Sequence, residues 1–415
     1  MSSLDRDFDA LLNDPEIFQP CAQVTYVNST RINSTTKFTI LEKSDEDIPL
    51  ICAAPPSQDA EWTLRLLLFP EVTPKGYPIP MSKFAWKAVN EHWGIGSALM
   101  YHYRRATGIA FARTVLHHDH TLQAIGLDFD TLGLTYLTIT HDMANKDVRG
   151  LVFGLRADKL KDLKWRLESA RDLGCHPLLA PLITTDMSVN DTRSAMITIA
   201  ISLNKGIGPF TFKNVYGHRG YNEAPDLGAL PFTLTELAIY ANESGKRLKR
   251  LEAMLQFIDE QFASSTMNID LNTHMKERMG HHITQVKEDA RSIQPNIVEV
   301  QQNIQTGVQL VYALLAQKDN ELNHRYGADM RVIAAVTLAF LPGTFMATLF
   351  SASFWDFNPN NARPRVSKWV WVYWITTFGL TAVVMILWRG HPTLATLRKR
   401  WQRRNHSEGV EKKEA

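Results

Sequence analysis

The sequence contains little cysteine, and the three cysteines it has form no recognisable pattern. Cys21, Cys52 and Cys175 are odd in number and widely spaced among the 415 residues. They therefore specify neither a disulfide framework nor a zinc site, and we expect a reducing, cytosol-facing compartment for this part of the chain. The first residues, MSSLDRDFDALLNDPEIF, are acidic and lack an apolar core, so we also expect no secretory signal.

The sequence also has no large excess of positive or negative charge. The formal net charge is +2, which creates no strong field toward a polyanion, and we expect no nucleic-acid partner. The sequence also lacks internal repeats, a low-complexity linker, a phosphate-binding loop, a dinucleotide-binding fingerprint and a Ser-His-Asp order. Without these motifs an enzyme is the less favoured class, although an enzymatic role for the N-terminal half stays open.

The sequence does contain two long uncharged runs near its C-terminal end. Residues 332–354 read VIAAVTLAFLPGTFMATLFSASF, and residues 369–388 read WVWVYWITTFGLTAVVMILW. About 20 apolar residues are enough to cross a bilayer as a helix. Trp and Tyr are concentrated at the start of the second run, as expected at the level of the lipid headgroups. We predict two C-terminal transmembrane helices over these ranges.

The residues around the two runs predict an orientation. Residues 389–415 contain the basic cluster RKRWQRR, and positively charged flanks usually stay on the cytoplasmic side. Two spans then give an integral, two-pass membrane protein with both termini in the cytosol and only the loop 355–368 outside. The basic tail is also expected to bind anionic lipid, at about 1 kcal/mol per charge near the surface.

The N-terminal half mixes strand-like and helix-like patterns. Segments rich in β-branched and apolar residues, with partial alternation, lie at 62–69, 131–142 and 147–155. Helical patterns lie at 83–93 and 159–173. This mixture predicts an α+β or α/β cytosolic domain over residues 1–215, followed by a Gly- and Pro-rich boundary loop over residues 205–231.

The chain between this domain and the first apolar run has a helical pattern. From residue 234 apolar side chains recur at 3-4 spacing, and no strong breaker stands between Pro295 and the run. Residues 230–331 are therefore predicted to form a long helical stalk that continues without a break as the first span, 332–354. Pro295 should kink this helix or mark its true start.

One face of this helix carries hydroxyl and large apolar side chains at helical spacing. We call Met330, Thr337, Leu341, Thr344 and Thr348 the stripe, and Ser351 extends it. A polar face gains nothing against lipid, but it can line a pore or contact a neighbouring helix. Alternatively, the hydroxyls bond to carbonyls of their own helix and the small residues only permit close packing. A hairpin of two spans cannot enclose water, so a pore requires several copies in a ring.

The sequence AFLPGTFMATLFSASFWDF, with the long upstream helix, two spans and basic tail, resembles the CorA-type divalent-cation transporters, particularly their divergent fungal branch. In that family a Pro-x-Thr-Phe sequence near the end of the first span precedes a Gly-Met-Asn signature. Pro342, Thr344 and Phe345 match the first of these motifs. The resemblance implies a CorA-like fold, a homo-oligomer that is a pentamer in the family, and Mg²⁺ or another divalent cation as transported or regulatory ion.

The same resemblance assigns roles to the first span. The stripe would line the ion path, with Leu341 and Met330 as hydrophobic constrictions that open by wetting. Ser351, Ala352 and Ser353 stand where the family has its Gly-Met-Asn signature, at the outer entrance that selects the ion. There the family presents a ring of amide oxygens to a hydrated cation, and serine hydroxyls would hold such a cation more weakly.

A second hypothesis keeps the CorA-like scaffold but not the transport. The outer loop has one acidic side chain against three basic ones, Arg363, Arg365 and Lys368, a net charge of +2. A positive mouth repels Mg²⁺. Together with the altered signature, this charge favours a membrane-tethered binding or enzymatic protein, whereas the stripe favours the pore.

Two soluble clusters are candidates for metal binding. His117, His118, Asp119 and His120 offer imidazole and carboxylate groups that suit Zn²⁺, Ni²⁺ or Co²⁺, although adjacent ligands point in different directions and a solvated turn is the alternative. Glu277, His281 and Glu288 can share one helical face. They predict either a regulatory metal site between subunits or a charged surface.

Overall fold

A computed structural model of the chain describes residues 18–57, 59–71, 79–96, 110–117, 120–129, 136–174, 176–216, 229–264, 273–350, 371–384 and 386. The chain forms two compact units, Met1–Val311 and Tyr312–Ala415. The first unit contains a sheet and several helices, and the second contains the candidate membrane segments.

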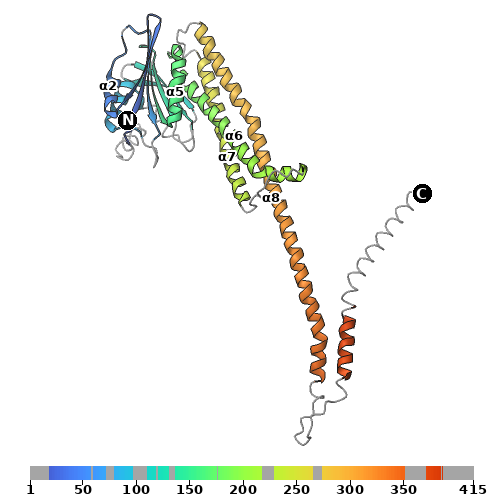
Figure 1. Ribbon diagram of the computed structural model, residues 1–415. Coiled ribbons are helices and arrows are strands. Elements are labelled where there is room, and N and C mark those ends of the chain that lie inside the picture. The colour runs from blue at the N-terminus through green and yellow to red at the C-terminus, as the bar shows by residue number, and fades with distance from the viewer. Residues whose placement is uncertain are drawn as a thin grey trace, which may run out of the picture. The chain divides into compact units, whose positions relative to one another are not determined.

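A seven-stranded sheet forms the N-terminal part of the first unit (Figure 1). Its strand order is β2-β1-β3-β7-β6-β5-β4, and every neighbouring pair is antiparallel except β3 and β7. The strands are β1 (Val24–Ile32), β2 (Thr35–Lys43), β3 (Trp62–Pro70), β4 (Ala110–His117), β5 (His120–Asp128), β6 (Tyr136–Asp142) and β7 (Asp147–Leu155).

The sequence patterns identified the central strands. The predicted segments 62–69 and 147–155 are β3 and β7, and the predicted segment 131–142 contains β6. Residues 131–135 of that segment lie outside the described residues. We did not predict β1, β2, β4 or β5 from the sequence. An α/β arrangement of the N-terminal domain is confirmed.

Helices cover both faces of the sheet. On one face α2 (Ile48–Ala53) and α3 (Lys83–Trp93) pack in a core that includes Leu67, Phe69 and Phe153. The neighbouring residues of β3 point to the opposite face, where α5 (Ala157–Ser169) lies (Figure 1). The helix predicted over 83–93 is confirmed, and the one predicted over 159–173 consists of α5 and the short 3-10 helix Arg171–Leu173.

The ends of α3 follow from its flanking residues. The Ser82 hydroxyl accepts a hydrogen bond from the Ala85 amide at 3.1 Å, which satisfies one of the free N–H groups of the first turn. Gly94 ends the helix at φ 67°, a left-handed conformation that glycine adopts without strain. A serine before the helix and a glycine after it therefore fix its length.

Three long helices follow the sheet domain: α6 (Leu179–Tyr216), α7 (Leu230–Ala263) and α8 (Thr273–Phe350). The loop predicted over 205–231 is wrong over its first part, because α6 continues to Tyr216. Pro295 does not mark the start of the last helix, since α8 begins at Thr273 and continues through it for 78 residues in all.

Gly307 of α8 lies against Ile207 of α6. A Cβ atom added at Gly307 would come within 2.1 Å of the Cδ1 atom of Ile207. A glycine there lets the two helices approach closely.

A buried ionic cluster joins the sheet to the helices on its α2 and α3 face. Asp147 is fully buried and binds the guanidinium groups of Arg65 and Arg149, at 3.3 Å and 2.5 Å from their Nε atoms. Arg65 also donates to the Ala54 carbonyl at 2.6 Å, and Arg149 donates to the His92 carbonyl at 2.8 Å. Asp142 lies 3.6 Å from Arg149 as well, so two buried carboxylates balance the two cations that hold the C-terminal ends of α2 and α3.

Candidate functional site

The apolar segments lie in the second unit. Within the described residues, α8 is the one helix long and apolar enough to cross a membrane, and Trp371–Val384 is a shorter apolar helix. The first predicted span is therefore confirmed as an apolar helix up to Phe350. The outer loop 355–368, the proposed entrance at Ser351, Ala352 and Ser353, and the basic tail 389–415 lie outside the described residues.

The two apolar helices of the second unit contact each other through small residues. A Cβ added at Gly343 would lie 3.7 Å from Cγ2 of Thr377, so the helices approach closely there. Pro342 is buried beside this contact. Small residues at such a contact are typical of packed membrane helices. The Pro342–Gly343 side of α8 therefore faces the second helix of the same chain.

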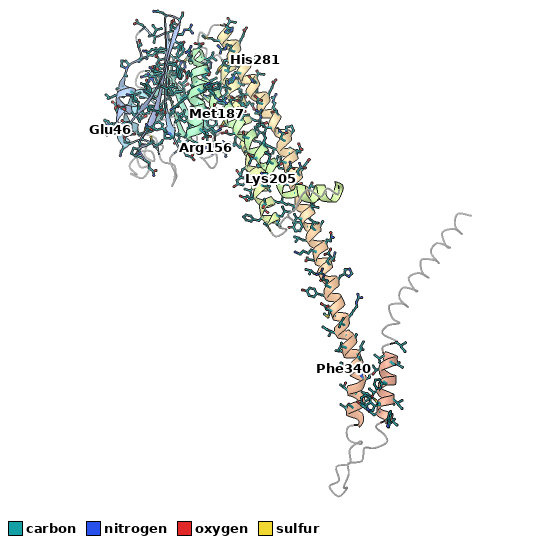
Figure 2. The ribbon with its side chains drawn as sticks, in the orientation of Figure 1. Glu46, Arg156, Met187, Lys205, His281 and Phe340 are labelled. Carbon is teal, nitrogen blue, oxygen red and sulfur yellow. The ribbon has the colours of Figure 1, made fainter. Side chains whose placement is uncertain are left out.

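The stripe lies on a different side of α8. Thr337, Thr344 and Thr348 are exposed, and Leu341 and Met330 are 65% and 71% exposed. Figure 2 labels Phe340, another exposed residue of this part of the helix. The second helix of the same chain thus leaves the stripe uncovered, so the stripe is available either to lipid or to other copies of the chain.

The hydroxyl groups of the stripe donate to their own helix. Thr337 bonds to the carbonyls of Ile333 and Ala334 at 3.1 Å and 2.9 Å, Thr344 to that of Leu341 at 3.0 Å, and Thr348 to that of Phe345 at 2.8 Å. The bonding of hydroxyls to their own helix, which is the alternative to a polar pore lining, is therefore present. It uses only the hydroxyl proton, and each oxygen keeps lone pairs that can accept from water. The stripe can still face the hydration shell of a cation.

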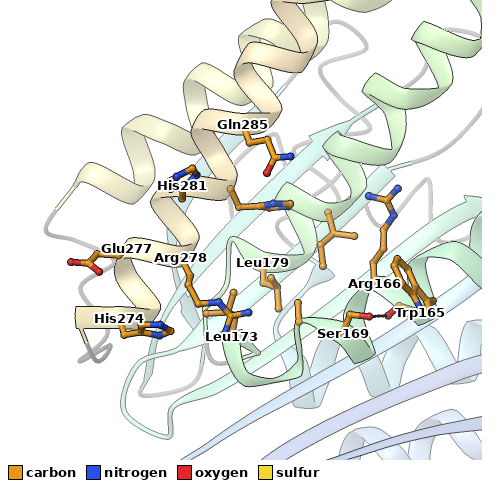
Figure 3. Close-up of a pocket in the computed structure, with 13 residues that line it drawn as sticks. Trp165, Arg166, Ser169, Leu173, Leu179, His274, Glu277, Arg278, His281 and Gln285 are labelled. Atoms are coloured by element: carbon orange, nitrogen blue, oxygen red, sulfur yellow. Dashed lines mark hydrogen bonds between the residues drawn. The ribbon is translucent and has the colours of Figure 1, made fainter.

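The first unit contains a pocket between α5, the start of α6 and the start of α8. It encloses about 570 Å³. Its floor is apolar, with Leu173, Leu179 and Ile183 buried, while Trp165 at its rim is 65% exposed. Figure 3 shows that His274 and Arg278 project from the first turns of α8 toward this floor, whereas Glu277 points away. The pocket thus combines an apolar floor with a cationic wall.

The structure places only part of the proposed HHDH metal site. His117 ends β4 and pairs with His120 at the start of β5, and His118 and Asp119 lie outside the described residues. The Nε2 atom of His117 is 2.9 Å from the Glu91 carbonyl oxygen, to which its N–H donates. That bond holds the ring against the end of α3. A metal site at His117, His118, Asp119 and His120 stays a prediction.

The second candidate, on α8, gains no support. Glu277 and His281 line the pocket described above, but Glu288 does not. Among the residues that the structure describes, no group of three or more His, Cys, Asp or Glu side chains could hold a metal ion. A regulatory metal site between subunits at Glu277, His281 and Glu288 stays a prediction, with a charged surface as its alternative.

The sequence did not reveal a pair of buried histidines on the α5 face of the sheet. His141 on β6 and His176 just before α6 are both buried, and burial lowers the pKa of each to about 4. The Nδ1 atom of His176 accepts a hydrogen bond from the Leu178 amide at 3.2 Å, and its ring centroid lies 5.6 Å from that of Phe262 on α7. Both imidazoles are therefore neutral at pH 7, and that of His176 packs against α7.

These histidines predict a loss of stability in acid. Their pKa values in the folded protein, about 4, lie below the ordinary 6.5, so the unfolded chain binds more protons between those values. The stabilising contribution is complete above pH 6.5 and is lost as the pH falls toward 4, at up to about 1.4 kcal/mol per pH unit for each histidine. Urea unfolding between pH 7 and pH 4.5 measures this slope.

A matched pair of variants isolates the effect. The Nδ1 atom of His141 has no hydrogen-bond partner among the described residues, so His141→Gln removes a titrating group without breaking a bond seen here. We expect a shallower acid slope for His141→Gln and an unchanged slope for the exposed His324→Gln. An unchanged slope in His141→Gln would show that this ring does not titrate with unfolding.

Comparison with known proteins gives structural similarities only. The chain matches no family model and no curated protein. It is similar in structure to the full-length CmaX protein, with a TM-score of 0.43 and 12% sequence identity over 89% of this chain and 97% of that chain. It is also similar to the CorA magnesium transporter from Methanocaldococcus jannaschii, with a TM-score of 0.40 and 11% identity over 88% and 97%.

A third similarity is to the soluble domain of that CorA protein, with a TM-score of 0.35 and 9% identity over 66% of this chain and 94% of that chain. At such low identities and TM-scores, these similarities carry no argument about function. The function must therefore be inferred from the residues and the geometry of this chain.

Proposed function

We propose that the chain is a CorA-like, two-pass membrane protein that assembles with copies of itself and conducts a divalent cation such as Mg²⁺ along the first span. The observation that carries the proposal is the uncovered stripe of α8, which the second apolar helix of the same chain leaves exposed. Copies arranged in a ring would bury this stripe around a shared axis. Both termini lie in the cytosol, and the tail 389–415 binds anionic lipid.

The chemistry of the stripe supports a path for a hydrated ion. Threonine oxygens that donate to their own helix remain acceptors toward water, and water-mediated contacts hold a hydrated ion without stripping its first shell. Leu341 and Met330 are large, apolar and exposed on the same face. In a ring of copies they would form dry constrictions that close the path.

The second candidate is a CorA-like scaffold that does not transport and instead binds a ligand in its soluble unit. The observations that favour it are the back-bonded threonine hydroxyls, the Ser-Ala-Ser sequence at 351–353 and the net positive outer loop. A closed bundle whose hydroxyls are satisfied internally needs no water path.

Mg²⁺ uptake by liposomes that contain the purified protein separates the two candidates. We expect uptake above that of empty liposomes for the parent chain, and more uptake after replacing Ser351, Ala352 and Ser353 by Gly, Met and Asn. The replacement restores a ring of amide oxygens that can bond the first-shell water of the ion. Neutralising Arg363 and Arg365 should add to the effect, most visibly at low salt.

The absence of uptake by every variant would support the second candidate. If the parent, the triple replacement and the combined variant all match empty liposomes while the protein stays folded and oligomeric, transport is excluded under these conditions. The membrane-tethered binding protein then becomes the better account.

A further inference from the structure

We propose that the pocket between α5, α6 and α8 binds a small organic phosphate that carries a flat ring, the chemistry of a nucleoside monophosphate. The pocket belongs to the unit Met1–Val311. Its ligand is not part of the ion path, so ligand binding can be tested whether or not the protein transports ions. Its volume of about 570 Å³ lies in the range of pockets that enclose small organic ligands, roughly 300 to 1,000 Å³.

The anionic group of the ligand is specified by Arg278. This side chain is exposed on the wall of the pocket, and within the described residues it has no hydrogen-bond or ion-pair partner. The other arginine of the pocket differs, because Arg166 already binds Asp162 at 3.0 Å and also binds Asp186. An unpartnered guanidinium offers a planar fork of N–H donors that matches a phosphate.

His274 lies one helical turn before Arg278 and projects toward the same floor (Figure 3). Its ring provides a second nitrogen donor on this wall. A phosphate has three terminal oxygens and can bond to both side chains at once. Glu277, the acidic residue that lines this wall, points away from the floor (Figure 3) and leaves the anion unopposed.

The apolar part of the ligand is specified by the opposite side of the pocket. Leu173, Leu179 and Ile183 form a buried floor, and the indole of Trp165 stands exposed at the rim. A flat ring can lie on this floor and stack against the indole, which would remove apolar surface of both from water. Stacking of a base on an aromatic side chain typically contributes about 1–3 kcal/mol, which is a factor of roughly 5 to 150 in affinity.

Other ligand classes fit less well. Arg278 would repel a bare divalent cation, and no cluster of three metal-ligating side chains is found in the described residues. A free inorganic phosphate would leave the apolar floor and Trp165 in water. A neutral aromatic ligand would leave Arg278 unpartnered. Only a molecule with both parts uses all of the lining.

Isothermal titration calorimetry on the full chain in detergent tests the proposal with adenosine monophosphate, adenosine and inorganic phosphate as probes. We expect adenosine monophosphate to bind at least about tenfold more tightly than either fragment, because a charge-assisted hydrogen bond contributes about 1.5–3 kcal/mol. Arg278→Gln should weaken the monophosphate about tenfold or more and leave adenosine unchanged. Trp165→Ala should weaken both.

The matched control is Arg291→Gln. Arg291 is also an exposed arginine on α8, but it lines a different cavity, so its loss should change none of the affinities. Equal effects of the Arg278 and Arg291 variants would reduce the binding to general charge attraction and overturn the proposal. The absence of monophosphate binding to the folded parent chain would also overturn it.

Discussion

Replacing Asp147 by alanine is expected to destabilise the first unit by about 3–5 kcal/mol. The change leaves the buried guanidinium groups of Arg65 and Arg149 without their shared counter-ion. Breaking a buried ion pair from one side typically costs about 3–5 kcal/mol, because an uncompensated charge stays in the interior. A loss of that size is a large fraction of the stability of an ordinary domain, about 5–15 kcal/mol.

Urea unfolding monitored by tryptophan fluorescence measures this loss. Asp158→Ala is a matched control, because Asp158 also pairs with an arginine, Arg156, but both side chains are more than half exposed. An exposed pair of this kind contributes little, so the control should unfold close to the parent. Similar midpoints for the Asp147 and Asp158 variants would show that the buried cluster does not hold α2 and α3 to the sheet.

Replacing Leu341 by asparagine is expected to raise Mg²⁺ uptake strongly. In the proposed assembly Leu341 forms an apolar ring around the path, and a polar ring at the same level would stay wet when the leucine ring is dry. If the replacement lowers the barrier by only about 1.4 kcal/mol, uptake rises about tenfold. Uptake into liposomes, compared at equal protein content, provides the measurement.

Val336→Asn is the control for this change. Val336 is 49% exposed on the same helix and lies off the stripe, because it has no three-, four- or seven-residue spacing to any of its members. The variant therefore introduces the same polar group nearby without facing the proposed path. Its uptake should remain close to that of the parent. If both asparagine variants raise uptake alike, the amide perturbs the helix in general and the stripe has no special role.

The strands that could be predicted from the sequence are those whose residues are nearly all buried, because burial gives them a continuous apolar sequence. β3 and β7 lie in the middle of the sheet, and their apolar residues made them recognisable. β2 and β4 form the two edges, and in β2 polar and charged side chains face solvent and obscure the alternation. The end of α6 was missed because its Gly- and Pro-containing sequence favours a loop, whereas the helix continues to Tyr216.

The candidate sites could be predicted only where their members lie close together in the sequence. The stripe follows from the spacing of residues on one helix. Asp147 and Arg65 are 82 residues apart, and the pocket joins Trp165 to Arg278 across more than one hundred positions. Residues so far apart form no recognisable motif in the sequence, so only the folded chain shows that these groups lie together.

The most direct test of the central claim is whether the stripe faces the conducting path. Thr344→Cys and Val336→Cys, the second of which lies off the stripe, are placed separately in the parent chain, and Mg²⁺ uptake into liposomes is measured before and after a positively charged, membrane-impermeant thiol reagent. A charge fixed at Thr344 should block the path by repelling the cation, while Val336→Cys and the parent chain should keep their uptake. Equal uptake of both cysteine variants after the reagent, or no uptake above empty liposomes before it, would contradict the account.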